Sequence, residues 1–249
     1  MPPPDPDLRL PILGTTAGNI AQHVLVVGDP ARAEDTARRL DESREVGRNR
    51  EYVSFTGVYD GVPVTVCSHG VGASGAATCF EELGRAGVRR IVRAGTCGGL
   101  QEEVGDGDLI VGTAAVRDDG LTERLIGLAY PAVADPRLTL QLEDQARRTG
   151  QQTHVGVVHT AANFHPPSIG EPSWKVWRQA GAVAIEMEYA ALLVIASLHG
   201  IEAGGIFTSD GNLLTAEADM SDYAPHREVV EDGKRAMITA ALQALVADA

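Results

Sequence analysis

Residues 24–32 read VLVVGDPAR, and this stretch decides the fold class. Four consecutive apolar residues are followed at once by a glycine, an Asp-Pro pair and an alanine-rich helical pattern. A short apolar run without alternation is typical of a strand buried on both faces. Gly28 marks the turn, and Pro30 suits the first position of a helix. The stretch therefore predicts a strand-to-helix unit of an α/β protein.

The same pattern recurs further along the chain. Apolar runs lie at residues 62–67, 91–92, 183–185 and 204–208, and most lead into a helical pattern. Such alternation is the signature of a sheet that is covered by helices on both faces. The sequence shows no interdomain linker, so we predict a single α/β domain over residues 1–249.

Two helices are predicted together with their ends. Asp135-Pro136 has the chemistry of an N-cap followed by the first helical residue, and Gly150 closes the segment 137–149. The segment 228–246 places apolar side chains on one stripe, so we expect it to pack that face on the sheet.

The charge balance narrows the classes of function. With 34 acidic and 21 basic side chains in 249 residues, the formal net charge is −13. Nucleic acids and anionic membrane surfaces need a basic partner, so we expect neither. The three cysteines form no zinc-ligand pair, and no stretch resembles a signal peptide or a membrane span. We therefore expect a soluble, cytoplasmic protein without a metal site.

Two strand ends carry arginines beside glycines. Gly28 and Arg32 follow the first strand, and Arg93 and Thr96 lie in RAGTCGGL (93–100). In open α/β sheets ligands bind where strands end and helices begin. Glycine amides, a hydroxyl and guanidinium groups together suit a phosphate dianion. The alternative interpretation is an ordinary turn with surface arginines.

The turn SHGVGASG (68–75) contains the spacing G-x-G-x-x-G. This spacing between a strand and a helix is typical of dinucleotide binding, but Arg93 stands where the ribose-binding acid is expected. NADP binding is one interpretation, and a glycine turn that supports a different site is the one we favour. His69, beside this turn, is either a pocket residue or a structural one.

Acidic residues follow two later strands. Glu186-Met187-Glu188 lies between an apolar strand and an apolar helix, and Asp210 follows the run 204–208. The alternatives are helix capping for the glutamates and a turn role for Asp210.

Together these stretches resemble the nucleoside phosphorylase family, in its hexameric purine nucleoside and uridine phosphorylase type. The resemblance runs from about residue 20 to the C-terminus and leaves residues 1–20 as an N-terminal extension. Its motifs, in the family's order, are VVGDPAR (26–32), NREY (49–52), SHGVG (68–72), FEELGRAG (80–87), RAGTCGGL (93–100), AAVRDDG (114–120), IEMEYA (185–190) and SDG (209–211).

The resemblance implies a three-layer α/β/α sandwich around a mixed, partly barrel-like β-sheet. It implies a pentosyltransferase without a cofactor, in which a nucleoside and orthophosphate react reversibly to give a free base and ribose 1-phosphate. It also implies a homohexamer, a trimer of dimers, in which Arg50 of NREY crosses the dimer interface to the phosphate of its neighbour.

The resemblance also implies the site residues, motif by motif. Those implied to bind phosphate are Gly28, Arg32, Arg50, Arg93 and Thr96. Those implied to hold the ribose are Glu186, Met187 and Glu188. Those implied to contact the base are Val71, Phe164 and Asp210. The two with a catalytic role are Arg93 and Asp210.

The identity of the base depends on Asp210. In purine-type relatives the acid of the SD motif faces N7 of the base, whereas uridine-type relatives place a glutamine and an arginine shortly after the stacking aromatic. Phe164 is followed by HPPSIG (165–170), which has neither. We therefore favour a 6-oxopurine nucleoside, with uridine or dual specificity as the alternative. The N-terminal histidine that the family often offers to a neighbour's 5′-hydroxyl is absent from RLPI (9–12), so a 5′-modified nucleoside is a further alternative.

Three other functions compete with this one. A nucleosidase of the same fold would use water and would not need Arg32, Arg50 and Arg93 together. An NADP oxidoreductase depends on residues 70–75 alone. A non-catalytic nucleoside-binding protein would bind without turnover.

Overall fold

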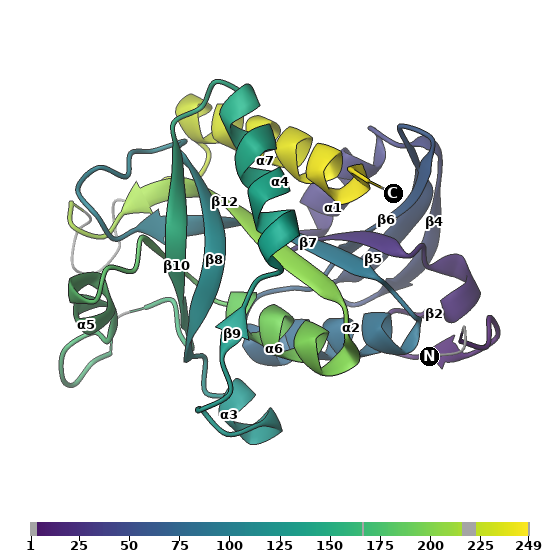
Figure 1. Cartoon of the computed structure of the whole chain (residues 1–249), viewed down its shortest axis with the longest axis horizontal. Coiled ribbons are helices and arrows are strands. Elements are labelled where there is room, and N and C mark those ends of the chain that lie inside the picture. The colour runs from purple at the N-terminus through teal and green to yellow at the C-terminus, as the bar shows by residue number, and fades with distance from the viewer. Residues whose placement is uncertain (1–3, 166, 216–222, 249) are drawn as a thin grey trace.

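The computed structural model describes residues 4–165, 167–215 and 223–248 (Figure 1). Its strands are β1 (Arg9–Leu10), β2 (Thr15–Thr16), β3 (His23–Val27), β4 (Asp41–Asn49), β5 (Tyr52–Tyr59), β6 (Val62–Ser68), β7 (Arg90–Gly99), β8 (Leu109–Asp118), β9 (Ala132–Val133), β10 (Thr153–Ala161), β11 (Ala184–Glu186) and β12 (Glu202–Asn212). Its helices are η1 (Ala17–Asn19, a 3₁₀ helix), α1 (Pro30–Ala37), α2 (Ala73–Arg85), α3 (Thr122–Leu125), α4 (Pro136–Arg148), α5 (Trp174–Gln179), α6 (Tyr189–His199) and α7 (Glu228–Val246).

The central sheet is mixed and partly closed. Its order in the described residues is β11-β10-β8-β12-β7-β3-β6-β5-β4, with β9 paired to β8. The strands β3, β6 and β7 run parallel, whereas β4, β5 and β6 pair antiparallel. The short strand β11 pairs with β10 and also, antiparallel, with β7. Five strands, β7, β8, β10, β11 and β12, therefore close into a barrel-like ring.

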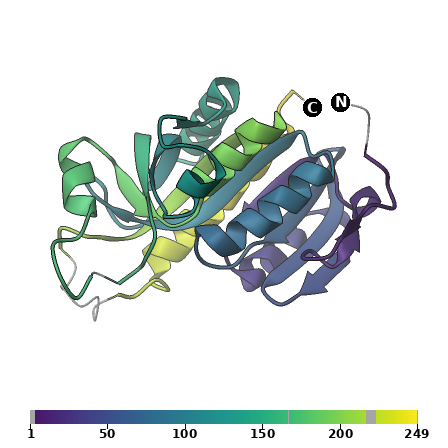
Figure 2. The same ribbon diagram turned by 90° about the horizontal axis from the view of Figure 1, so that it is seen from below.

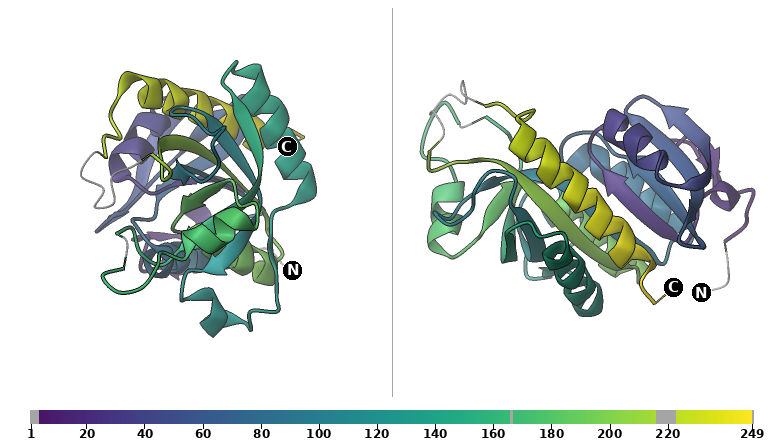
Figure 3. Two further views of the ribbon diagram at one scale, coloured as in Figure 1. Left: turned by 90° about the vertical axis from the view of Figure 1, so that its left-hand side faces the viewer. Right: turned by 90° about the horizontal axis from the view of Figure 1, so that it is seen from above.

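Helices cover both faces of the sheet and give three layers. The helices α2 and α6 lie side by side on one face, which is the near face in Figure 2. The helices α1, α4 and α7 lie on the opposite face, seen from above in the right panel of Figure 3. A buried apolar cluster fills the space between each helical layer and the sheet. The predicted α/β/α sandwich around a mixed, partly barrel-like sheet is confirmed.

Local sequence signals set the starts of two helices. The Asp29 carboxylate caps α1 by accepting from the amide of Ala31 at 2.8 Å, and Pro30 is the first helical residue. The Asp135 carboxylate caps α4 in the same way. Because α1 begins immediately after β3, Arg32 sits on the first helical turn at the end of the sheet.

The long helix α7 anchors the second layer. Its stripe of Val230, Met237, Ala241 and Leu245 is fully buried, as the periodicity predicts. Within the described ranges, none of the helices has the length and apolarity needed to cross a membrane.

The described part of the N-terminal extension packs on the domain. Leu10 and Leu13 are buried, and the Glu82 carboxylate on α2 accepts from the amides of Ile12 and Leu13 at 2.9 and 2.8 Å. Residues 1–3 lie outside the described ranges.

Candidate active site

A cavity of about 770 Å³ opens at the edge of the sheet where the ends of β3, β10, β11 and β12 meet the second half of β7. Of the residues predicted to form the site, those that line it are Gly28, Arg32, Val71, Arg93, Thr96, Phe164, Glu186, Met187, Glu188 and Asp210. Arg50 is exposed and does not line this cavity, although its neighbour Glu51 does. A single subunit therefore brings together the predicted residues except Arg50.

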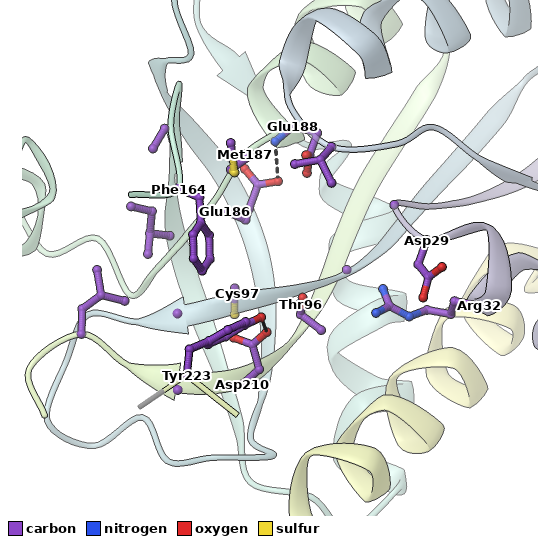
Figure 4. A pocket seen from close by; sticks show the side chains of 18 of the residues that line it. Asp29, Arg32, Thr96, Cys97, Phe164, Glu186, Met187, Glu188, Asp210 and Tyr223 are labelled. Atoms are coloured by element: carbon purple, nitrogen blue, oxygen red, sulfur yellow. Dashed lines mark hydrogen bonds between the residues drawn. The ribbon is translucent and has the colours of Figure 1, made fainter. Parts of the chain in front are cut away.

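One end of the cavity carries the positive charge of Arg32, with the Asp29 carboxylate near it. In Figure 4 the Arg32 guanidinium points into the site toward Thr96, and Phe164 and Tyr223 lie on the opposite side of the site. Among the residues that the structure describes, no carboxylate pairs with Arg32. Burial lowers the pKa of Arg32, although a guanidinium stays charged at neutral pH. Because a desolvated, unpaired cation is costly, this end of the cavity is suited to an anion.

Arg93 lies in a buried cluster with two carboxylates. Its Nε donates to Glu186 Oε2 at 3.1 Å, and its Nη2 donates to Glu188 Oε2. The three side chains are 4%, 1% and 6% exposed. Glu188 Oε1 accepts from the amide of Gly72 at the start of α2. Desolvation raises the pKa of Glu188 against the opposing effect of Arg93.

Glu186 and Glu188 contact the same arginine. β11 ends at Glu186 and α6 begins at Tyr189, so the chain bends between them. Glu186 also accepts from the Thr160 hydroxyl at 2.7 Å and from the amides of Glu188 and Tyr189 at 2.8 Å each. Glu186 therefore fixes Arg93 and the start of α6, and both glutamates line the cavity.

Asp210 reaches the cavity through a β-bulge in β12. Ser209 pairs with Cys97 and Gly211 with Gly98, so Asp210 is the extra residue between them. A bulge re-aims a side chain that regular pairing would place elsewhere. Asp210 is 6% exposed, and burial raises its pKa more than its polar contacts lower it. The site thus holds a carboxyl group that takes up a proton more readily than an exposed aspartic acid does.

An aromatic pair stands beside Asp210. The Tyr223 hydroxyl donates to Asp210 Oδ2 at 2.7 Å, and the Tyr223 ring meets the Phe164 ring edge-on at 5.3 Å. Figure 4 shows these rings at the opposite side of the site from Arg32. Val71, 79% exposed, lies at the rim. The sequence analysis missed Tyr223, because a lone tyrosine between a strand end and a helix carries no motif.

The glycine turn serves this same cavity. Gly70 and Gly72 have φ of +73° and +90°, a conformation that favours glycine, and the Gly72 amide binds Glu188. This geometry favours the interpretation of residues 68–75 as a support for the site over a dinucleotide fingerprint. Within the described part of the chain, no group of three or more His, Cys, Asp or Glu side chains is arranged to hold a metal ion.

The site has three chemically distinct regions. Arg32 suits an anion, and Glu188 and Met187 border the middle of the site. Phe164 and Tyr223 stand at the side away from Arg32, and Asp210 lies between Tyr223 and Thr96, with a hydrogen bond to each (Figure 4). A carboxylate orients hydroxyl groups by accepting from them, and an aromatic ring stacks on a planar heterocycle. The arrangement can hold an anion, a sugar and a ring in that order.

The comparison with known families agrees with this arrangement. The model of the phosphorylase superfamily matches residues 22–246. The chain belongs to this family. The family prediction from the sequence motifs is therefore confirmed.

Individual relatives of this phosphorylase-superfamily chain are similar over most of its length. It is 35% identical to the guanosine phosphorylase of Halorubrum lacusprofundi over 96% of the chain and 99% of the relative. It is 35% identical to the uridine phosphorylase of Thermococcus kodakarensis over 80% of the chain and 76% of the relative. These relatives are nucleoside phosphorylases, so the predicted enzyme class, a pentosyltransferase, is confirmed.

Solved structures show the same fold. The purine nucleoside phosphorylase of Toxoplasma gondii, solved in complex with immucillin-H, is 33% identical, with a TM-score of 0.87 over 93% of each chain. The uridine phosphorylase of Vibrio fischeri is 27% identical, with a TM-score of 0.86 over 96% of this chain and 98% of that one.

Proposed function

We propose that this phosphorylase is a purine nucleoside phosphorylase that acts on 6-oxopurine nucleosides and orthophosphate, without a cofactor. The observation that carries the choice of base is the bulge residue Asp210, a buried carboxyl with a raised pKa beside Phe164. A protonated carboxyl can donate to a ring nitrogen, which a purine offers at N7. The similarity to a guanosine phosphorylase over nearly the whole chain supports the same choice.

The reaction follows from the order of the three regions. Phosphate held by Arg32, Arg93 and Thr96 attacks C1′ of the ribose. The C1′–N9 bond breaks and its electron pair leaves with the base, while Asp210 protonates N7. Positive charge develops on the sugar ring, and the fixed phosphate dianion stabilises it. Proton donation to the leaving base contributes about 10²–10⁴-fold to the rate.

Arg93 joins the anion and sugar regions in this scheme. It contacts Glu188, which accepts hydrogen bonds from the ribose hydroxyls, and it lines the phosphate space. The proposal includes a cytoplasmic homohexamer, a trimer of dimers, in which Arg50 completes the phosphate site of a neighbour. Its exposure, outside its own cavity, supports that role.

Uridine phosphorylase is the second candidate. It is supported by the uridine phosphorylases among the relatives and solved structures. The absence of a glutamine and an arginine from residues 165–170 speaks against it.

The deciding experiment measures base release from inosine, guanosine, adenosine and uridine, each with and without orthophosphate. We expect phosphate-dependent release, fastest from a 6-oxopurine nucleoside. Fastest release from uridine would replace the purine assignment. Release without phosphate would indicate a nucleosidase, and no release would overturn the proposed function.

A further inference from the structure

A buried histidine contacts the arginine of the anion site but does not itself line the cavity. His69 follows β6 and is 0% exposed. Its Nε2 lies 2.7 Å from Arg93 Nη1, and its Nδ1 lies 2.9 Å from the carbonyl oxygen of Gly70. None of the roles predicted from the sequence motifs involves this pair.

The two contacts of the ring fix its tautomer. A guanidinium group has only donors, so Nε2 facing Arg93 must be the unprotonated, accepting nitrogen. The carbonyl of Gly70 is an acceptor, so Nδ1 must carry the proton. Both conditions hold together in a neutral imidazole alone, because a protonated ring would present an N–H to Arg93.

The surroundings of the ring keep it neutral. Burial, Arg93 and Arg32 all lower the pKa of His69 well below its ordinary value. The two carboxylates of the cluster, Glu186 and Glu188, bind Arg93 and make no hydrogen bond with His69. A change of charge on His69 is therefore opposed by two guanidinium groups and by desolvation.

The packing around the ring leaves it little freedom. The Phe80 ring of α2 meets the imidazole edge-on at 5.4 Å. The amides of His69 and Gly70 donate to the carbonyl oxygens of Val27 and Gly28 at 2.9 and 3.0 Å, which continues the pairing of β6 with β3. The accepting Nε2 is thus held in place by the Phe80 ring of α2 and by the backbone pairing that continues from β6 and β3.

The neutral state of the His69 ring matters because charged side chains already surround Arg93. Arg93 is matched by two carboxylates, and its Cζ lies 5.6 Å from the centre of the Phe207 ring. A third carboxylate on the Nη1 side would add negative charge beside an anion site. A neutral acceptor fixes the same N–H without adding charge that repels the ligand.

We propose that His69 is a positioning residue for Arg93, a neutral acceptor that holds the guanidinium in the orientation in which it binds phosphate. This inference rests on the proposed function for the identity of the anion. It concerns an effect transmitted through Arg93, not a contact of His69 with substrate.

The test compares two variants that differ by one methylene group. In His69→Gln the amide oxygen reaches about as far from the backbone as Nε2, whereas in His69→Asn it falls short of Arg93. Binding of inorganic phosphate is measured by calorimetry on the intact protein, without turnover. We expect His69→Gln to bind phosphate within about threefold of the unchanged protein and His69→Asn to bind it about tenfold or more weakly, the effect of losing a charged hydrogen bond. His199→Gln, which alters a histidine that pairs with Glu81 away from the cavity, is the matched control and should change nothing.

The outcomes separate the inference from the proposed function. If the unchanged protein binds no phosphate, the proposed function and this inference both fail. If it binds phosphate and the Asn and Gln variants bind equally well, the inference fails alone. Nitrogen NMR of the His69 ring in the unchanged protein is a second test that needs no variant. We expect a neutral ring with the proton on Nδ1 at neutral pH, and a protonated ring or the other tautomer would overturn the proposal.

Discussion

The two arginines of the anion site differ in what their removal leaves behind, and Arg32→Ala tests that difference. Arg32 lines the cavity and forms no ion pair with a carboxylate among the described residues, so its loss strands no carboxylate. The expected cost is that of its contact with phosphate. A hydrogen bond to a charged group contributes about 1.5–3 kcal/mol, which corresponds to about a 10- to 150-fold weaker phosphate affinity.

The assay has a kinetic and a thermal part. The KM for phosphate, measured at saturating guanosine, should rise by the same factor as the loss of affinity, about 10- to 150-fold. The unfolding temperature without phosphate should stay the same or rise slightly, because removing an unpaired, desolvated cation costs nothing in folding. Phosphate at 100 times its Kd should raise the unfolding temperature of the unchanged protein by about 5–10 °C, from about 2.7 kcal/mol of binding free energy. The same phosphate concentration should raise the unfolding temperature of Arg32→Ala much less.

The matched control lies next to the same helix. Arg38→Ala removes an arginine at the end of α1 that is 73% exposed and pairs with Asp35. It should change neither the KM for phosphate nor the thermal response. An unchanged phosphate KM in Arg32→Ala, or an equal rise in both variants, would refute the reasoning.

Three further changes test the rest of the site. Asp210→Asn should slow purine phosphorolysis about 10²–10⁴-fold and uridine phosphorolysis much less. Equal losses for both substrates would show that Asp210 is not the acid that protonates N7. Only protonated Asp210 donates, so the purine rate should fall as pH rises through its raised pKa, and this fall should vanish in the Asn variant. Tyr223→Phe removes a hydrogen bond that lowers the pKa of Asp210, so the decrease of the purine rate should occur at higher pH in this variant. A decrease at lower pH would contradict the hydrogen bond between Tyr223 and Asp210. Glu186→Gln breaks a buried ion pair with Arg93 and should cost about 3–5 kcal/mol of unfolding free energy in a denaturant titration, whereas the exposed Glu102→Gln should cost almost nothing.

Local signals predicted much of the fold. The sequence placed the α4 helix at 137–149, within one residue of its observed bounds, because Asp135-Pro136 and Gly150 act at its ends. The strand β4 (Asp41–Asn49) gave no such signal. It is a mostly charged and exposed edge strand, held by pairing with β5. The extended conformation of β4 is therefore determined by pairing with β5, and the residue pattern of β4 itself does not predict it.

The site was predictable as a set of residues but not as a set of contacts. Ends of neighbouring strands converge in an α/β sheet, so residues at those ends gather without knowledge of their distances. The contacts of Arg93 with the two glutamates join residues 93 and 95 positions apart, which no local pattern shows. The contacts of His69 with Arg93 and of Tyr223 with Asp210 join residues 24 and 13 positions apart, with no periodic relation.

The bulge at Asp210 has a consequence for engineering the enzyme. A bulge residue is exempt from the register of its strand, so an exchange at position 210 does not change which neighbours face the core. Position 93 offers no such freedom, since its side chain joins two buried carboxylates. An exchange at position 210 therefore keeps the strand in register, whereas an exchange at position 93 would leave two buried carboxylates without their partner. With Asp210 as the proposed acid of the base, a library confined to position 210 would vary base preference on an unchanged scaffold.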